Sequence, residues 1–255
     1  MSERVKICHL YPDLMNLYGD RGNVLALWRR CLWHGLEVAV TPAFLGDEPD
    51  FGSFDIVFLG GGQDREQKLI CDDLVHRKGE SLRRAALDGV VILGICGGYQ
   101  LLGRYYRTAA GEVIPGVGVL DLYTEAGPRR LIGNVVVKSP LGATGDGDAC
   151  ARTLVGFENH SGKTRLGPGA RPLGRVVVGN GNNGEDGTEG AVHLNVVGTY
   201  LHGSLLPKNP WLADFLISRA MERRGVSGRL LRLDDALEER AHQAAIRRAC
   251  GGRRA

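Results

Sequence analysis

The sequence predicts an α/β protein with a largely parallel central sheet, helices on both faces, and an antiparallel extension of that sheet. The N-terminal half alternates short apolar runs with helix-like segments. This alternation is typical of a parallel sheet buried on both faces. The middle of the chain instead carries successive strand-like, turn-rich runs with few helices between them. We predict a single domain over residues 1–255, with a core at about 4–223 and a helical extension at about 224–255.

Four strands are expected in the N-terminal half, at residues 5–10, 36–41, 55–59 and 90–95. A helix near residues 23–33 is indicated by apolar residues at intervals of three and four, namely Val24, Leu27, Trp28, Cys31 and Leu32. Further helices are expected near 66–87 and from 97 to about 106. The glycine-rich segment 179–190 is predicted to be a flexible loop or hairpin tip, and helices at about 210–223 and 234–248 are expected to end the chain.

Composition narrows the class of protein. The formal net charge of +3 is too small to indicate nucleic-acid binding. No apolar run reaches the roughly 18 residues of a membrane-spanning helix, and the N-terminus has no apolar signal core, so we expect a cytoplasmic protein. The six cysteines include no pair with zinc or redox-motif spacing. We therefore predict no metal site, and the default role of each cysteine is that of a small core residue.

Cys96 departs from that default because it follows the apolar run 90–95 and precedes a helix-like segment. The pattern Gly94-x-Cys96-x-Gly98 is the thiol counterpart of the G-x-S-x-G elbow, whose glycines permit a sharp turn that exposes a nucleophile. A helix N-terminus beside the sulfur favours the reactive thiolate. The pattern therefore indicates an active cysteine, and the alternative is a structural strand-to-helix turn.

Two further segments support a nucleophilic site. A second apolar run, 55–59, leads into Gly60, Gly61 and Gly62, a loop whose backbone N–H groups suit an oxyanion or another anion. His202 ends an apolar strand at the same predicted edge of the sheet, where ligands bind in parallel α/β folds. The other histidines give weaker signals: His193 lies in an alternating strand, and the rest resemble surface or core residues, namely His9, His34, His76 and His242.

Four motifs together, LGGGQDREQ, GICGGYQLLG, GFENHSG and GTYLHGSLLPKNPWLAD, resemble class I glutamine amidotransferases, which have a flavodoxin-like fold. The chain is most similar to the cobyric acid synthase-like branch, which keeps the cysteine and histidine but lacks the usual acid two residues after the histidine. Ser204 occupies that position. The opening HLYPDLMNLYGDRGNVLAL narrows the resemblance to the amidotransferase subunits of lipid II isoglutaminyl synthases.

The resemblance implies roles for individual residues. Cys96 would attack the side-chain amide of L-glutamine, and His202 would activate the thiol and protonate the departing ammonia. The backbone N–H groups of Gly97 and Gly61 would hold the oxyanion, and Gln100 would help to seat the substrate.

An arginine would bind the α-carboxylate of the substrate. Arg130 matches the family's glutamine-binding arginine, and its guanidinium suits a carboxylate. Arg129 is the rival, since strand alternation lets only one of the two face the site. Asn159 and His160 are expected near the pocket or in a turn.

The serine at position 204 leaves the histidine without its usual acid. Either a Cys–His dyad suffices, or another residue, such as one from a partner subunit, supplies the carboxylate. The resemblance implies such a partner: MurT, a Mur-ligase-like subunit that uses ATP and Mg²⁺ to activate D-glutamate of the lipid II stem peptide. This chain itself would carry no cofactor.

Three alternatives remain open from the sequence. The chain could serve another acceptor, such as a cobyrinate-type carboxylate. It could be a stand-alone cysteine amidase or peptidase of similar fold. It could also be a binding module in which Cys96 is inert.

Overall fold

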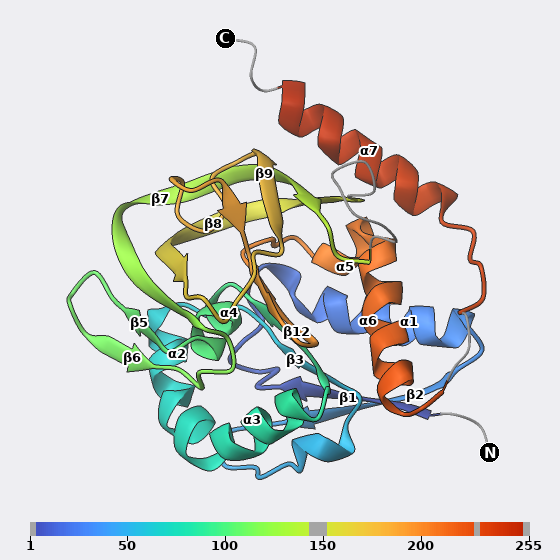
Figure 1. The fold of residues 1–255 in the computed structure, drawn as a ribbon, viewed down its shortest axis with the longest axis horizontal. Coiled ribbons are helices and arrows are strands. Elements are labelled where there is room, and N and C mark those ends of the chain that lie inside the picture. Colours follow the sequence, from blue (N-terminus) through green and yellow to red (C-terminus); the bar gives the residue numbers. More distant parts are fainter. Residues whose placement is uncertain (1–3, 143–151, 227–229, 252–255) are drawn as a thin grey trace.

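The computed structural model describes residues 4–142, 152–226 and 230–251 (Figure 1). Its first sheet has the strand order β11-β12-β4-β3-β1-β2. Five of these strands are parallel: β1 (Arg4–Leu10), β2 (Glu37–Ala43), β3 (Ile56–Leu59), β4 (Val91–Ile95) and β12 (Val196–Thr199). Only the edge strand β11 (Ala191–His193) runs antiparallel to its neighbour. The four strands predicted for the N-terminal half are all present, within two residues at each end.

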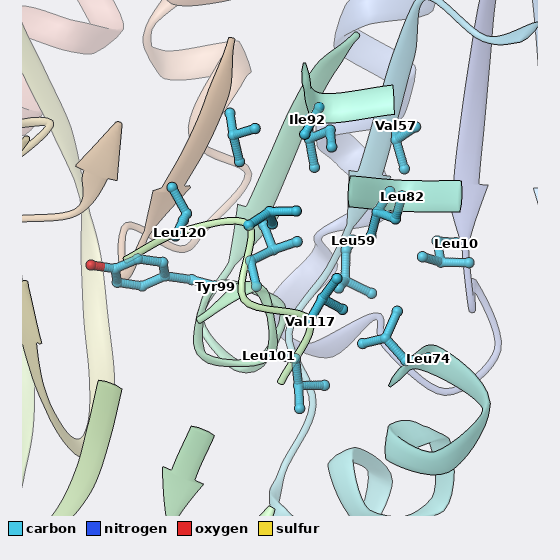
Figure 2. Close-up of a cluster of buried hydrophobic side chains, with 14 of the residues drawn as sticks. Leu10, Val57, Leu59, Leu74, Leu82, Ile92, Tyr99, Leu101, Val117 and Leu120 are labelled. Carbon is cyan, nitrogen blue, oxygen red and sulfur yellow. The ribbon is translucent and has the colours of Figure 1, made fainter. Parts of the chain in front are cut away.

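Helices cover both faces of this sheet, as predicted. One face packs on α1 (Arg21–Trp33), α5 (Leu205–Lys208) and α6 (Pro210–Arg223). The other packs on α2 (Asp64–Asp72), α3 (Gly79–Leu87) and α4 (Gly97–Leu102). Figure 2 shows the second cluster, where Leu10, Leu59 and Ile92 of the sheet lie near Leu74, Leu82 and Leu101 of the helical layer. Burial on both faces explains why these strands read as continuous apolar runs.

The helix predicted over residues 66–87 is divided in the structure. Between α2 and α3 the chain forms a π-helical stretch, Asp73–Arg77. Its first residue, Asp73, is buried and accepts hydrogen bonds from the hydroxyl of Tyr11 at 2.7 Å and from the N–H of Gly46 at 3.1 Å, and it pairs with Lys78. The widened turn thus accompanies a carboxylate that is drawn inward, which hydrophobic periodicity cannot reveal.

The strands of the middle region form a second, mostly antiparallel sheet in which β5 runs parallel to β7, so that β11 alone extends the first sheet. The order is β10-β9-β7-β5-β6, with β8 paired to β7. These strands are β5 (Tyr105–Arg107), β6 (Val113–Pro115), β7 (Leu122–Ser139), β8 (Arg152–Leu166), β9 (Gly174–Val178) and β10 (Thr188–Glu189). Long β7 and β8 form an antiparallel pair that arches over the carboxyl end of the first sheet (Figure 1).

The helix predicted to run from Gly97 to about Tyr106 is shorter than expected. It ends at Leu102, and Tyr105–Arg107 is strand β5. Gly103 turns the chain with an extended ψ of −168°, and a Cβ there would lie 2.2 Å from Cδ1 of Leu122. The close approach of β7 therefore ends the helix.

The segment 179–190 is not a projecting tip. Asn182 and Asn183 are almost fully buried, and the side chain of Asn182 accepts hydrogen bonds from the hydroxyl of Tyr99 at 3.0 Å and the N–H of Gly190 at 2.9 Å. Turn-rich composition predicted the turns here, but it gave no sign that asparagine side chains would fix them to the core.

The C-terminal part closes the fold. Helix α6 occupies the predicted residues, whereas α7 (Ala236–Gly251) begins two residues later than predicted. The segment before α7 is anchored by buried Arg30, which donates to Asp214 and Asp235. Two short 3₁₀ helices complete the inventory, Leu17–Gly19 and Phe51–Ser53. None of the helices in the described ranges is long and apolar enough to cross a membrane.

Candidate active site

Cys96 occupies the expected sharp turn between β4 and α4. Its backbone has φ 49° and ψ −104°, a conformation that non-glycine residues rarely adopt. The turn is held because the N–H of Cys96 donates to the carbonyl of Thr199 at 2.8 Å. A Cβ on Gly98 would lie only 2.4 Å from the carbonyl oxygen of Leu59, so glycine is required beside the thiol. Such strain, which costs about 1–3 kcal/mol, is typical of functional sites.

His202 lies three residues beyond the end of the neighbouring strand β12 and is 1% exposed. Its backbone is fixed by two hydrogen bonds to Phe157 of β8, at 2.8 and 3.2 Å. Burial lowers the pKa of His202, but Asp20 and the Cys96 sulfur favour the imidazolium more strongly, and the pKa is raised to about 10. A Cβ on Gly61 would lie 3.0 Å from Cε1 of His202 and 3.6 Å from Cβ of Cys96. The structure therefore brings Cys96 and His202 together, although they lie 106 positions apart in the sequence.

A buried carboxylate that the sequence analysis missed stands behind this histidine. Asp20 is fully buried, and its Oδ1 lies 3.6 Å from Nδ1 of His202. Its other oxygen, Oδ2, accepts a hydrogen bond from the N–H of Gly61 at 2.6 Å. The only sequence signal was the polar run YGDRGN before α1, and a separation of 182 residues gives no spacing that would connect Asp20 to His202.

The same hydrogen bond corrects one expectation about the oxyanion hole. Because the N–H of Gly61 is donated to Asp20, it is not available to an oxyanion in this structure. Gly62 lies next to Gly97 instead: a Cβ on Gly97 would lie 2.8 Å from the nitrogen of Gly62 and 2.5 Å from its oxygen. The glycine loop and the start of α4 thus approach each other more closely than side chains would allow.

A cavity of about 290 Å³ opens beside Cys96. Its volume is at the lower end of the roughly 300–1,000 Å³ found for small-molecule sites. Arg130 borders this cavity and Arg129 does not, so of the two arginines left open by strand alternation the geometry favours Arg130. The Nε of Arg130 donates to Asn159 at 2.9 Å, and Asn159 donates to the hydroxyl of Tyr18 at 2.8 Å, whose ring packs edge-on against His202.

Gln100 and His160 also border the cavity. The amide of Gln100 is held at both ends, because Nε2 donates to the hydroxyl of Tyr200 at 3.1 Å and Oε1 accepts from Gln67 at 2.9 Å. The ring of His160 stacks on that of Tyr200, and its Nδ1 bonds the carbonyl of Gly162 at 2.7 Å, where it must be the donor. Both residues therefore combine a fixed structural position with a face on the cavity.

The remaining thiols in the described part of the chain lack this setting. Burial raises the pKa of Cys8 and of Cys31 to about 12, and it also raises the pKa of Cys71. Cys250 is exposed on α7, and Cys150 lies outside the described residues. Two larger hollows, of about 910 and 1,140 Å³, lie along α6 and residues 230–239, away from Cys96.

A strained cysteine elbow, a buried histidine just beyond the adjacent parallel strand and a glycine loop form the arrangement that is typical of cysteine-dependent α/β enzymes. Residues 6–210 match the family model of the CobB/CobQ-like glutamine amidotransferase domain. Among curated relatives, the GatD subunit of lipid II isoglutaminyl synthase (glutamine-hydrolyzing) from Staphylococcus aureus is 42% identical over 95% of both chains. The GatD subunit from Streptococcus pneumoniae is 43% identical over 87% of this chain and 82% of its own length.

Solved structures agree on the fold. A chain of PurLQS from Thermotoga maritima superposes with a TM-score of 0.52 at 16% identity, covering 87% of this chain and 99% of the other. This chain therefore belongs to the CobB/CobQ-like glutamine amidotransferases and, within them, to the GatD subunits of lipid II isoglutaminyl synthases. The expectation of a class I glutamine amidotransferase is confirmed.

Proposed function

We propose that this chain hydrolyses L-glutamine at Cys96 and His202 and delivers ammonia to a MurT-like, ATP-dependent partner. That partner amidates D-glutamate of the lipid II stem peptide to D-isoglutamine. The observation that carries the proposal is the strained Cys96 elbow beside buried His202, in a chain related over 95% of its length to a lipid II isoglutaminyl synthase subunit.

In the first half-reaction, the thiolate of Cys96 attacks the side-chain amide carbon of glutamine. The C–S bond forms as the carbonyl π electrons move onto oxygen, and backbone N–H groups stabilise the oxyanion. Gly97 supplies one donor, and Gly62 replaces Gly61 as the second, because Gly62 adjoins Gly97 while the Gly61 N–H is bound by Asp20. Loss of one such donor typically costs about 2.7–4 kcal/mol of barrier.

Collapse of the tetrahedral intermediate breaks the C–N bond. His202, as imidazolium, gives its proton to the departing nitrogen, so that ammonia leaves and a γ-glutamyl thioester remains. The now neutral His202 takes a proton from water, whose oxygen attacks the thioester. Collapse of this second intermediate breaks the C–S bond, releases glutamate, and returns the thiolate and imidazolium pair.

The substrate is oriented by the far wall of the cavity. The Nε of Arg130 is occupied by Asn159, which leaves the terminal nitrogens of the guanidinium for a carboxylate. A planar fork of this kind matches the α-carboxylate of glutamine. Gln100 and His160 border the same cavity and can contact a substrate held there.

In this scheme the partner carries out the ATP-consuming step, and this chain supplies only ammonia. ATP and Mg²⁺ act there, where the acceptor carboxylate is activated before ammonia attacks it. GatD of Staphylococcus aureus carries the name of a subunit, so its relatives are expected to work in a complex.

The test is glutamate release from glutamine by the full chain, alone and with a MurT-like partner, in wild type and Cys96→Ser. Release that requires Cys96 and rises with the partner is the expected result. A matched control is Cys71→Ser, because Cys71 is a partly exposed thiol that does not border the cavity.

Other outcomes identify the alternatives. Rapid Cys96-dependent hydrolysis of other amides, without any effect of the partner, would indicate a stand-alone amidase. Ammonia transfer to a cobyrinate-type carboxylate, and not to lipid II, would show that the complex serves that other acceptor. Absence of Cys96-dependent release under both conditions would refute the glutaminase mechanism.

A further inference from the structure

We propose that Asp20 is the missing acid of this site: it positions His202 with one carboxylate oxygen and the glycine loop with the other. The inference rests on the proposed function, which gives Cys96 and His202 their tasks. It assigns the role of the acid that other class I amidotransferases carry at the position of Ser204 to a residue from the N-terminal segment of the same chain.

The first observation is an unsatisfied buried pair. Oδ1 of Asp20 and both ring nitrogens of His202 are buried and have no hydrogen-bond partner within the described part of the chain. Burying such groups without a partner is costly, so native proteins rarely leave them unpaired. Oδ1 and Nδ1 lie 3.6 Å apart, slightly beyond the roughly 3.2 Å limit of a good N–H···O bond. A small approach of the two side chains would satisfy both.

The orientation of the ring follows from this pairing. With Nδ1 turned to the carboxylate, the proton of the neutral ring sits on Nδ1 and Nε2 is left to exchange a proton with the Cys96 thiol. This is the task that the carboxylate performs in Ser–His–Asp enzymes, where it fixes the tautomer and stabilises the imidazolium.

The second observation concerns Ser204, which occupies the usual position of the acid. Its hydroxyl donates to the carbonyl of Gly19 at 3.0 Å, directly before Asp20. The packing is close, because a Cβ on Gly22 would lie 2.3 Å from the same hydroxyl oxygen. Asn23 adds a second link, since its Oδ1 accepts from the N–H of Leu206 at 2.9 Å. Ser204, at the position of the usual acid, therefore holds in place the segment that carries Asp20.

The third observation is the second oxygen of the carboxylate. By accepting from the N–H of Gly61, Asp20 joins the glycine loop to His202 through one rigid side chain. A Cβ on Gly61 would lie 3.0 Å from both Oδ2 of Asp20 and Cε1 of His202, so a larger residue there would force one of these side chains to move. Loss of the carboxylate would thus disturb the imidazole and the loop together.

The charged surroundings of His202 do not offer a competing acid within the described residues. Cys96 faces it from the elbow, and the ring of Tyr18 covers it. The other charged groups nearby are cations: Lys208 lies close to Gly203, the residue after His202, and Arg21 follows Asp20 in the chain. His9 also lies near Asp20, where burial lowers the pKa of His9 to about 4 and keeps that ring neutral.

The experiment compares Asp20→Asn with wild type in two measurements on the full chain. The first is the titration and tautomer of His202, followed by ¹⁵N NMR of the imidazole and assigned with His202→Gln. The second is the pH profile of glutamate release in the presence of the partner. Asp55→Asn is the matched control, because Asp55 is also a buried carboxylate that accepts a backbone N–H, that of Lys6 at 2.8 Å.

We expect Asp20→Asn to lower the pKa of His202 by about one unit or more, since an opposite charge within about 4–6 Å typically shifts a pKa by 1–3 units. The alkaline limb of the pH profile then moves to lower pH. The kcat falls by about 10²-fold or more, as for loss of general acid–base catalysis, while KM for glutamine changes less than about threefold. Asp55→Asn leaves both the titration and the pH profile unchanged.

A folded Asp20→Asn variant with unchanged His202 titration, or with turnover within about threefold of wild type, would overturn the inference and place the acid elsewhere. The NMR measurement does not depend on the substrate. If wild type released no glutamate, the proposed function would fail, while the His202 titration would still decide whether Asp20 controls the charge of the Cys–His pair.

Discussion

At the scale of single residues, backbone and environment rather than residue type distinguish the site. Cys96 is one of five described cysteines, and it alone has a positive φ and borders the cavity. Arg129 and Arg130 make a similar contrast. Both are exposed, in a stretch where the pairing of β7 with β8 shifts register. Only Arg130 borders the cavity. Arg129 is therefore a suitable control for substitutions of Arg130.

Replacing Arg130 by alanine should weaken glutamine recognition. Hydrogen bonds to charged groups contribute about 1.5–3 kcal/mol, so kcat/KM for glutamine should fall by roughly 10- to 150-fold in Arg130→Ala. Arg129→Ala should stay within about twofold of wild type, because that side chain does not border the cavity. Steady-state glutamate release measures both. Equal losses in the two variants would contradict the assignment.

At the scale of elements, the site depends on close backbone approach between the β4–α4 turn and the β3–α2 loop. The N–H of Gly98 donates to the carbonyl of Gly60 at 3.1 Å, and several glycines are needed because their Cβ atoms would overlap backbone. Overpacking of this kind cannot be relieved by a change of rotamer, because the obstructing atoms belong to the main chain.

Gly98→Ala should therefore reduce stability and activity together. Its Cβ would lie 2.4 Å from the oxygen of Leu59 and 2.6 Å from that of Gly60, so we expect about 1–3 kcal/mol less free energy of unfolding. Gly133→Ala in β7 is the control, because a Cβ there meets nothing within 4 Å. Urea denaturation gives the stabilities. A Gly98→Ala variant as stable as Gly133→Ala would contradict this prediction, because the backbone at Leu59 and Gly60 would then accommodate the added methyl group without cost.

The elements also show how far sequence patterns reach. Apolar runs and periodicity predicted four of the five parallel strands, α1 and α6, because these features depend on local alternation of burial. The fifth, β12, lies in the stretch expected to be antiparallel, and it pairs with β4 across about 100 residues of intervening chain. The elbow at Cys96 and the position of His202 followed from their place at strand ends. Asp20 did not, since its contact with His202 joins residues 182 positions apart. The short α4 and the buried Asn182 were also missed, because they depend on packing against distant strands.

At the scale of the whole molecule, the two sheets are joined by a buried carboxylate. Glu189 of β10 is fully buried and accepts hydrogen bonds from the N–H of Tyr200 at 2.8 Å and the hydroxyl of Thr199 at 3.0 Å, at the end of β12. Burial raises the pKa of Glu189 to about 7, although these hydrogen bonds oppose the shift. The junction of the sheets therefore titrates near neutrality.

Stability should follow this titration. The pKa of Glu189 in the folded protein lies above the roughly 4.3 of an unfolded chain, so the folded state binds the extra proton between these values. The contribution is present below about pH 4.3 and is lost as the pH rises towards 7. The unfolding free energy of the wild type should therefore fall between pH 5 and pH 8. In Glu189→Gln, which cannot ionise at this position, the fall should be smaller by about 1–3 kcal/mol.

Urea denaturation at both pH values measures this effect. Glu185→Gln is the control, because the exposed carboxyl of Glu185 has its pKa lowered by bonds to Lys163 and Arg165 and therefore does not titrate in this range. Parallel pH curves for wild type and Glu189→Gln would contradict the prediction.

The strand order has a consequence for synthesis of the chain. Strand β4, with all five residues buried, lies between β3 and β12, yet β12 is the last parallel strand to leave the ribosome. Until residue 199 is available, β4 presents an open apolar edge, the kind of edge that pairs with other chains. A nascent or truncated chain that stops before β12 should therefore both lack His202 and aggregate through the strand that carries Cys96, so misfolding and inactivity coincide. In the finished chain, the strand that covers the edge of β4 is also the strand that leads to His202.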